Sequence, residues 1–370
     1  MSHAAPELDT GTLHAQVWGD GDPVIALHPL ALESSAFAGL AAPLAARGLR
    51  TLAVDLPGFG KSPNPNAPLT PERLAAPVLD LARGLERPAL LLGISLGGRV
   101  ALEIALADPR AVRGVVCVAP FLPWRRWRIP MDWMEHFDPR WGEWLPLEKI
   151  WPLLKLVTER LERVPDLEHD WLARAAVRVI YYSSCPATRV AFLSAVREMA
   201  LDPGDGPHSL WARLPRLAVP ITFVWAGRDA LIPRRHAGDV ATLLPAAGRL
   251  EVPCAGHFVS GAHFRCMRHA IALAVDRTLE ASGNARGSGN ARGSGSLRAV
   301  GGGVTVAPCL AHARELDEDA PDAGGATPAR AASCTRGSSS SPRRSASRSA
   351  SPDLRFARAS GPPRVPTPRS

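Results

Sequence analysis

Short apolar runs alternate with stretches of helical character along the first 280 residues. The helical stretches cover residues 37–47, 71–83, 96–107 and 264–279, and the apolar runs cover 23–27, 49–56, 89–92, 112–118, 220–225 and 249–252. Continuous apolar runs of this length are typical of strands that are buried on both faces, as in a parallel sheet. The alternation therefore predicts an α/β domain with a doubly wound, mostly parallel sheet.

One long insertion interrupts this alternation. About a hundred residues without strand character lie between Ala119 and Pro220, which is too long for a plain loop. Residues 153–157 and 171–181 have helical character, so we predict a helical cap over about residues 121–214. The insertion holds eight of the ten tryptophans of the chain, namely Trp124, Trp127, Trp133, Trp141, Trp144, Trp151, Trp171 and Trp211.

The composition changes after Glu280. The hexapeptide that begins at Ser282 repeats directly at 288–293, and Ser, Arg, Pro, Gly and Ala dominate from there onward; the only apolar run is 303–310. Such a composition buries too little apolar surface to offset the entropy of the chain. We therefore predict one α/β domain over residues 1–280 and a disordered tail over residues 281–370.

The positive charge of the chain belongs mostly to the tail. The formal net charge is +8, and residues 281–370 carry 13 arginines against six acidic residues, which leaves +1 for residues 1–280. A nearly neutral domain offers no electrostatic reason to bind nucleic acid. The tail is either a basic interaction arm or a segment without a role of its own, and the second interpretation is favoured.

Cysteine usage and hydropathy indicate the setting of the chain. No early apolar run resembles a secretory signal, and no uninterrupted apolar stretch is long enough to span a membrane. The six cysteines form no CxxC pair and no metal-binding pattern. We therefore expect a reduced, cytoplasmic setting, no metal site, and a small buried apolar role for Cys254.

The strongest chemical signal is a serine between an apolar run and a helical stretch. Residues 93–97 read Gly-Ile-Ser-Leu-Gly and follow the run 89–92 directly. A Gly-x-Ser-x-Gly turn between strand and helix exposes the serine hydroxyl above the sheet. Glycines at both ends remove the Cβ atoms that would collide in so tight a turn. Alone, the pattern is weak, because an ordinary loop serine fits it too.

Three further motifs follow apolar runs in a fixed order. His28-Pro29-Leu30 follows the first run, Trp225-Ala226-Gly227-Arg228-Asp229 the fifth, and Ala255-Gly256-His257-Phe258 the last. Together with the serine turn, they resemble the α/β-hydrolase fold family over about residues 10–280. The chain order nucleophile, acid, histidine of that family is matched by Ser95, Asp229 and His257.

The resemblance implies a role for each of these residues. Ser95 is the nucleophile, His257 is the general base, and Asp229 orients the imidazole and stabilises its charged form. The backbone amides of Leu30 and Leu96 are the expected donors of the oxyanion hole. Pro29 stands where the family usually has glycine, and because proline has no N–H, the donor has to be Leu30.

Other residues compete for these roles. His263, six positions after His257, is the rival base, but it lies nearer the final helical stretch. Asp55 is an alternative acid, although it more simply fixes the Pro57-Gly58 turn. His28 is expected to brace the oxyanion loop and to take no part in the chemistry.

A serine at the elbow favours acyl chemistry over epoxide opening or halide displacement, for which the family uses aspartate. We expect a carboxylesterase-like serine hydrolase that cleaves an ester, lactone or thioester without a cofactor or metal. Carbon–carbon bond hydrolysis and acyl transfer by the same residues are alternatives, and so is a non-catalytic ligand-binding protein on this fold.

The first part of the insertion interleaves tryptophan with arginine. Trp124 and Trp127 either pack within the cap, line an apolar pocket for the substrate, or touch lipid head groups. The second interpretation makes them candidate substrate-binding residues. The expected partner is a small, apolar acyl substrate, and the oligomeric state is left open.

Overall fold

The computed structural model describes residues 6–124, 132–144, 186–257, 261–287 and 304–305. The described strands form one sheet in the order β1-β2-β4-β3-β5-β6-β7-β8-β9. All pairs from β4 to β9 in this order are parallel, and β2 pairs antiparallel with both β1 and β4. The strands are β1 (Glu7–Asp9), β2 (His14–Trp18), β3 (Asp22–Leu27), β4 (Leu49–Val54), β5 (Ala89–Ile94), β6 (Val112–Val118), β7 (Ile221–Ala226), β8 (Gly248–Val252) and β9 (Val304–Thr305).

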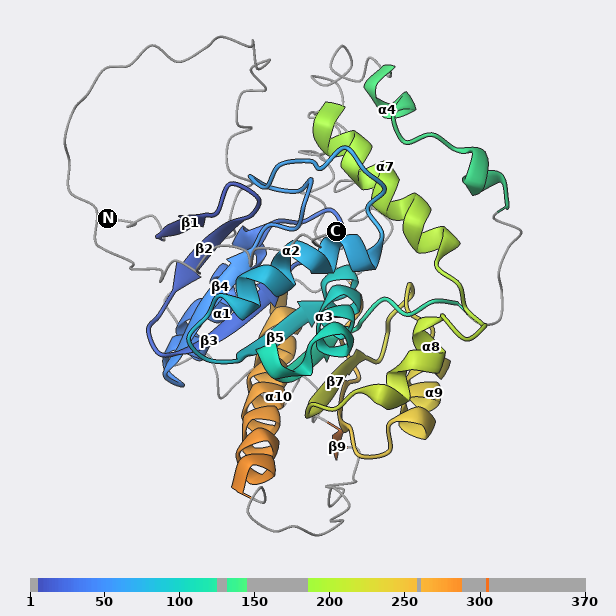
Figure 1. Ribbon diagram of the computed structural model, residues 1–370. Coiled ribbons are helices and arrows are strands. Elements are labelled where there is room, and N and C mark those ends of the chain that lie inside the picture. Colours follow the sequence, from blue (N-terminus) through green and yellow to red (C-terminus); the bar gives the residue numbers. More distant parts are fainter. Residues whose placement is uncertain (1–5, 125–131, 145–185, 258–260, 288–303, 306–370) are drawn as a thin grey trace, which may run out of the picture. The chain divides into compact units, whose positions relative to one another are not determined.

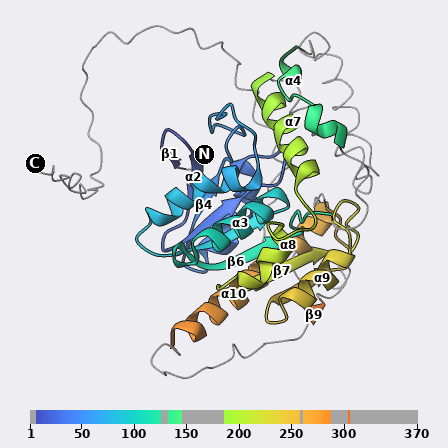
Figure 2. The same cartoon turned by 45° about the vertical axis from the view of Figure 1, so that its right-hand side comes forward.

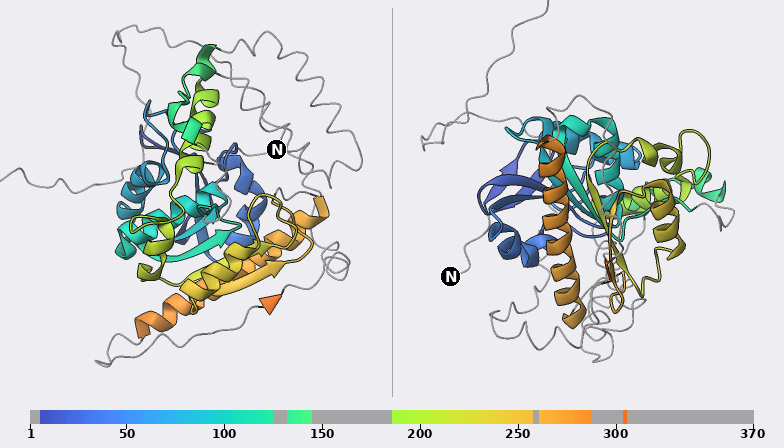
Figure 3. Two further views of the ribbon diagram at one scale, coloured as in Figure 1. Left: turned by 90° about the vertical axis from the view of Figure 1, so that its right-hand side faces the viewer. Right: turned by 90° about the horizontal axis from the view of Figure 1, so that it is seen from below.

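Helices cover both faces of this sheet (Figure 1). Helices α1 (Ala38–Ala45) and α10 (Gly261–Gly287) share a buried cluster on one face, where α10 runs along the sheet (Figure 3). The other face buries α2 (Pro71–Arg83), α3 (Leu96–Ala107) and α9 (Arg235–Leu243). The prediction of a doubly wound, mostly parallel α/β domain is therefore confirmed.

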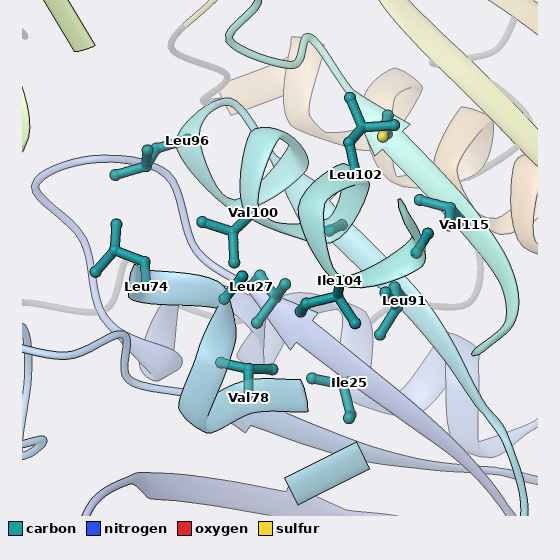
Figure 4. Close-up of a cluster of buried hydrophobic side chains, with 14 of the residues drawn as sticks. Ile25, Leu27, Leu74, Val78, Leu91, Leu96, Val100, Leu102, Ile104 and Val115 are labelled. Carbon is teal, nitrogen blue, oxygen red and sulfur yellow. The ribbon is translucent and has the colours of Figure 1, made fainter. Parts of the chain in front are cut away.

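Apolar side chains of neighbouring elements interlock between the sheet and helices α2 and α3 (Figure 4). Leu27 and Leu91 rise from adjacent strands, while Val78 and Val100 descend from the two helices, and all four are fully buried. The amphipathic pattern of α2 explains its place, because Leu74, Val78 and Ala82 lie on one face. This packing gives the loops at the carboxyl ends of the strands a rigid base.

The structure contains elements that the apolar pattern did not predict. Strands β1 and β2 and helix α9 mix polar with apolar residues, so none of them forms an apolar run. The helical stretch predicted over 37–47 corresponds to α1, and a short 3-10 helix, η1 (Ser34–Phe37), leads into it. Two departures concern the tail: α10 continues to Gly287, and Val304 of β9 pairs with Leu250 of β8.

The secondary-structure elements described in the insertion are all helices. They are η3 (Asp132–His136), α4 (Trp141–Trp144), α7 (Pro186–Leu201), α8 (Leu210–Arg213) and η5 (Leu214–Arg216). Helices α4 and α7 lie side by side (Figure 2), and the Arg189 guanidinium donates to the Gly142 carbonyl at 2.6 Å. The stretches 153–157 and 171–181 lie outside the described residues.

Cys254 differs from its sequence prediction. It is only half-buried and is disulfide-bonded, so the prediction of a small buried apolar residue is wrong. Of the other described cysteines, Cys117 is free and buried, and Cys266 is buried as well. The disulfide argues against the reduced setting that the cysteine spacing predicts. No helix in the described part of the chain is long and apolar enough to cross a membrane, and no cluster of metal-ligating side chains occurs there.

Candidate active site

Ser95 occupies the sharp turn between β5 and α3. Its backbone has φ 52° and ψ −113°, in a region that non-glycine residues rarely adopt. Two hydrogen bonds support this conformation: the Ser95 amide donates to the Val118 carbonyl at 2.9 Å, and the Phe121 amide donates to the Ser95 carbonyl at 2.9 Å. The strained turn is thus held by the end of β6 and by the segment that follows it.

The glycines of the turn allow its backbone to pack directly on other backbone. A Cβ atom on Gly97 would overlap the carbonyl oxygen of Leu27 at the end of β3, and one on Gly93 would overlap the Gly97 carbonyl. No side chain fits at either position. The start of α3 is consequently pressed against the loop that follows β3.

Ser95, His257 and Asp229 form one chain of hydrogen bonds. His257 Nε2 lies 3.0 Å from Ser95 Oγ, and His257 Nδ1 lies 2.8 Å from Asp229 Oδ2. With Nδ1–H donating to the carboxylate, Nε2 is left to accept the proton of the serine hydroxyl. Ser95 is 6% exposed, and the side chains of His257 and Asp229 are 7% and 4% exposed. The structure therefore brings together the three residues that the motifs single out.

Local backbone donors fix the Asp229 carboxylate. Asp229 follows β7, and its Oδ1 accepts from the amides of Leu231 at 2.8 Å and Ile232 at 2.7 Å. The other oxygen, Oδ2, is left for His257. Gly227 makes this turn possible, because a Cβ there would collide with the Pro253 backbone. The acid is thus oriented by its own loop and by the segment that leads to His257.

His28 holds the loop after β3 and lies apart from the hydrogen-bonded triad. The Leu56 amide donates to His28 Nε2 at 2.9 Å, so Nδ1 carries the proton and donates to the Pro29 carbonyl at 2.8 Å. Burial lowers the pKa of His28, so its imidazole stays neutral. The same Pro29 carbonyl accepts from the Leu32 amide at 3.2 Å. Pro29 therefore serves the loop as an acceptor.

The two expected oxyanion donors lie at the ends of these close-packed segments. Leu96 is the first residue of α3, where a helix leaves its amides without helical partners, and Leu30 follows Pro29 in the loop after β3. Neither amide is hydrogen-bonded to another described residue. Both N–H groups thus remain able to donate to a substrate.

The rival residues lie elsewhere or have other partners. The Asp55 carboxylate accepts from the amides of Ser34 at 2.6 Å and Lys61 at 2.9 Å and contacts His14 Nδ1 at 2.8 Å. Asp55 thus connects the segments that contain Ser34, Lys61 and His14 and does not orient His257. His263 lies in the first turn of α10. Sequence reasoning missed His14, whose short strand shows no apolar run.

The tryptophans of the insertion divide between surface and interior. Trp124 is 39% exposed, and Trp127 lies outside the described residues. Trp211, 3% exposed, donates from Nε1 to the Pro123 carbonyl at 2.7 Å. It joins the two ends of the insertion, a role that the sequence did not indicate.

The fold, the serine turn and the triad geometry agree with the comparison to known families. The model of the alpha/beta hydrolase family matches residues 24–268. This chain belongs to the alpha/beta hydrolase family. The expected α/β-hydrolase fold is thus confirmed, and the chain is an enzyme of the hydrolase class.

Similar proteins include esterases. The chain is 30% identical over 243 residues to a pimeloyl-acyl-carrier-protein methyl ester esterase of Edwardsiella ictaluri, an alignment that covers 63% of this chain and 85% of the relative. A protein of that name from Xanthomonas oryzae pv. oryzae is 32% identical over 251 residues, covering 66% and 91%. Among solved structures, a thioesterase domain from the curacin biosynthetic pathway aligns with a TM-score of 0.53 and 18% identity, covering 75% of this chain and all of that domain; that likeness concerns the fold.

Proposed function

We propose that this hydrolase cleaves a carboxylic ester or a related acyl compound through an acyl-enzyme at Ser95. The observation that supports this most directly is the hydrogen-bonded chain from Ser95 Oγ through His257 to Asp229 at the strained turn. Serine is a weak nucleophile at neutral pH, and a histidine within hydrogen-bond reach activates it. The alpha/beta hydrolase relatives named as methyl ester esterases support an ester as the substrate.

The proposed reaction has two halves. His257 Nε2 removes the Ser95 proton as Oγ attacks the acyl carbon, and the protonated imidazole then gives that proton to the leaving alcohol. Asp229 holds the imidazole and stabilises its charged form. In the second half, His257 activates a water that hydrolyses the acyl-enzyme and returns the free serine and a carboxylic acid. No step needs a cofactor or a metal ion.

The amides of Leu30 and Leu96 are the proposed donors to the developing oxyanion. Their support is positional: one begins the nucleophile helix, the other follows a turn fixed by His28, and the two segments touch where Gly97 meets Leu27. Preorganised donors of this kind are each worth about 3 kcal/mol of transition-state stabilisation. Trp124 is a proposed wall of the substrate site, and a small apolar acyl compound is the proposed substrate.

Active-site labelling of the full chain tests the proposal. A fluorophosphonate is expected to add once to the wild type and not at all to Ser95→Ala, as measured by intact mass. The variant is expected to lose turnover of p-nitrophenyl esters and to keep the melting temperature of the wild type. An adduct on Ser95→Ala, or turnover that survives the substitution, would show that another residue is the nucleophile.

A further inference from the structure

Five charged side chains join the nucleophile helix α3 to the end of the insertion. Arg99 lies one helical turn after Ser95, and its guanidinium donates to both oxygens of Asp202, at 3.0 Å from Nε and 3.3 Å from Nη2. Asp202 is the first residue after α7. A bidentate pair of this kind fixes orientation as well as distance. The end of α7 is therefore bound directly to the helix that carries the serine.

A second pair joins the same helix to α8. Arg213 of α8 donates to both oxygens of Glu103 at 2.6 and 2.7 Å, and Glu103 also accepts from Arg99. Glu72 of α2 approaches both guanidiniums, at 3.6 Å from Arg99 and 3.5 Å from Arg213. Arg99, Glu103 and Asp202 are 0%, 5% and 6% exposed. Water screens these charges weakly, so the network is much stiffer than a surface ion pair.

The beginning of the insertion is held on α3 as well. The Phe121 amide donates to the Ser95 carbonyl, and Pro120 packs against Gly98. Trp211 then ties the beginning to the end through the Pro123 carbonyl. Figure 1 shows the chain passing from α7 to α8 beside α3. Both ends of the insertion are thus attached to α3 and to the serine turn that precedes it.

Helix α7 lies over the loop that follows β4. Ala191 packs against Gly58, and Ser194 Oγ accepts from the Leu69 amide at 3.0 Å. The carboxyl ends of parallel strands share one edge of a sheet, so this loop and Ser95 lie on the same side of the domain. Ala191 and Ala195 belong to the buried cluster that contains Leu96. A shift of α7 would therefore disturb the loop after β4, at the edge of the sheet that carries Ser95.

We propose that Arg99 and Asp202 are positioning residues that hold α7 over Ser95 and so set the length of acyl chain that the enzyme accepts. The inference rests on the proposed function. A short acyl group stays close to Ser95 and is insensitive to where α7 lies. A longer one extends under the insertion and depends on it.

The charges around Asp202 add a dependence on pH. The Asp202 carboxylate faces Arg99 and Glu103 of α3 and Glu72 of α2. Through Glu103 it is also linked to Arg213 of α8. Burial raises the pKa of Asp202 above its usual value against the opposing effect of Arg99, and the negative charges of Glu72 and Glu103 raise it further. Protonation of Asp202 leaves two positive and two negative charges in the network. It also weakens the ion pair with Arg99 that binds the end of α7 to α3.

Asp202→Asn is the test, since it keeps the shape of the side chain and leaves two cations facing two anions. We expect the KM for p-nitrophenyl octanoate to rise about tenfold, while kcat/KM for p-nitrophenyl acetate and the rate of fluorophosphonate labelling stay within about twofold. The preference of the wild type for octanoate is expected to fall on acidification, and that of Asp202→Asn to be low at every pH. Arg83→Gln is the matched control, because Arg83 pairs at 2.9 Å with Asp108, at the end of α3, without touching the insertion.

Equal effects on both esters, or an octanoate preference that titrates in Asp202→Asn as in the wild type, would overturn the positioning role. Amide hydrogen exchange supplies a readout without substrate: amides at the end of α7 are expected to exchange faster in Asp202→Asn, with those of α2 unchanged. If the wild type cleaves neither ester, the proposed function fails. Unchanged hydrogen exchange at the end of α7 in Asp202→Asn would separately refute the role of the Arg99–Asp202 pair in holding α7.

Discussion

At the scale of single residues, the site depends on side chains whose hydrogen bonds allow only one orientation. Asp229 uses one carboxylate oxygen for two backbone amides and the other for His257. His28 is oriented in the same way by one donor and one acceptor. Because the partners other than His257 itself are backbone groups, the fold sets the orientation of both side chains.

Asp229→Asn is predicted to leave the shape of the site intact and to disable it. An amide that donates to Nδ1 forces the proton onto Nε2, so His257 cannot accept from Ser95. In comparable triads this costs about ten-thousand-fold in kcat. Stopped-time assays with p-nitrophenyl acetate measure the loss, and the exposed Asp80→Asn is the control. Activity near that of the wild type would remove Asp229 from the mechanism.

Residues that carry a motif could be predicted from the sequence, whereas residues that act through distant partners could not. Ser95, Asp229 and His257 each stand in a local pattern after an apolar run. Arg99 stands beside the same pattern, but its burial depends on Asp202, which lies more than a hundred positions away. A lone arginine in a helix is normally a solvated residue, and only tertiary structure shows otherwise.

At the scale of elements, the central strands could be predicted because both of their faces are buried. β3, β5 and β6 are apolar at every buried position, since helices cover each side of them, and their two charged residues, Asp22 and Arg113, are only half-buried. Strand β1 at the edge of the sheet and its neighbour β2 keep exposed or half-buried positions and lose that signal. Side chains also set the boundaries: β4 ends at Val54, because the next residue, Asp55, turns its carboxylate to the amides of other loops.

The contact between α3 and β3 gives a prediction for two glycines. Gly97→Ala would drive a methyl group into the Leu27 carbonyl and is expected to destabilise the fold by about 3 kcal/mol. Gly238→Ala in α9 meets no atom within 4 Å and is expected to stabilise by up to about 1 kcal/mol. Denaturant unfolding of both variants measures the difference. Equal stabilities would mean that the nucleophile helix can move away from β3.

At the scale of the whole molecule, the ion-pair network links stability to pH through Glu103. Burial alone would raise the Glu103 pKa, but Arg213 and Arg99 outweigh it and hold the pKa below its usual value. Ionised Glu103 therefore contributes stability that is fully present above its unfolded pKa and is lost as the pH falls through the folded one. Glu103→Gln is expected to cost about 3 kcal/mol at neutral pH.

The measurement is the melting temperature of the wild type and Glu103→Gln from neutral to acidic pH. The two curves are expected to converge on acidification, since the protonated wild type then resembles the variant. Parallel curves would show that Glu103 carries no net charge in the folded chain at neutral pH.

The domain as a whole could be predicted from sequence, because alternation of strand and helix specifies its layers. The insertion could be predicted only as a helical segment. Its helices pack through contacts such as Arg189 with Gly142 and Trp211 with Pro123, which leave no periodic signature. The length of the insertion predicts a cap over the sheet, whereas only its tertiary contacts show where it is attached.

The disulfide of Cys254 has a consequence for handling the protein. The bond lies three residues before His257, in the segment whose Pro253 backbone also presses on Gly227 of the Asp229 loop. A preparation kept with a thiol reductant and one kept without it are two covalent forms of the same chain. Kinetic constants and melting temperatures are therefore comparable only between samples of one redox state.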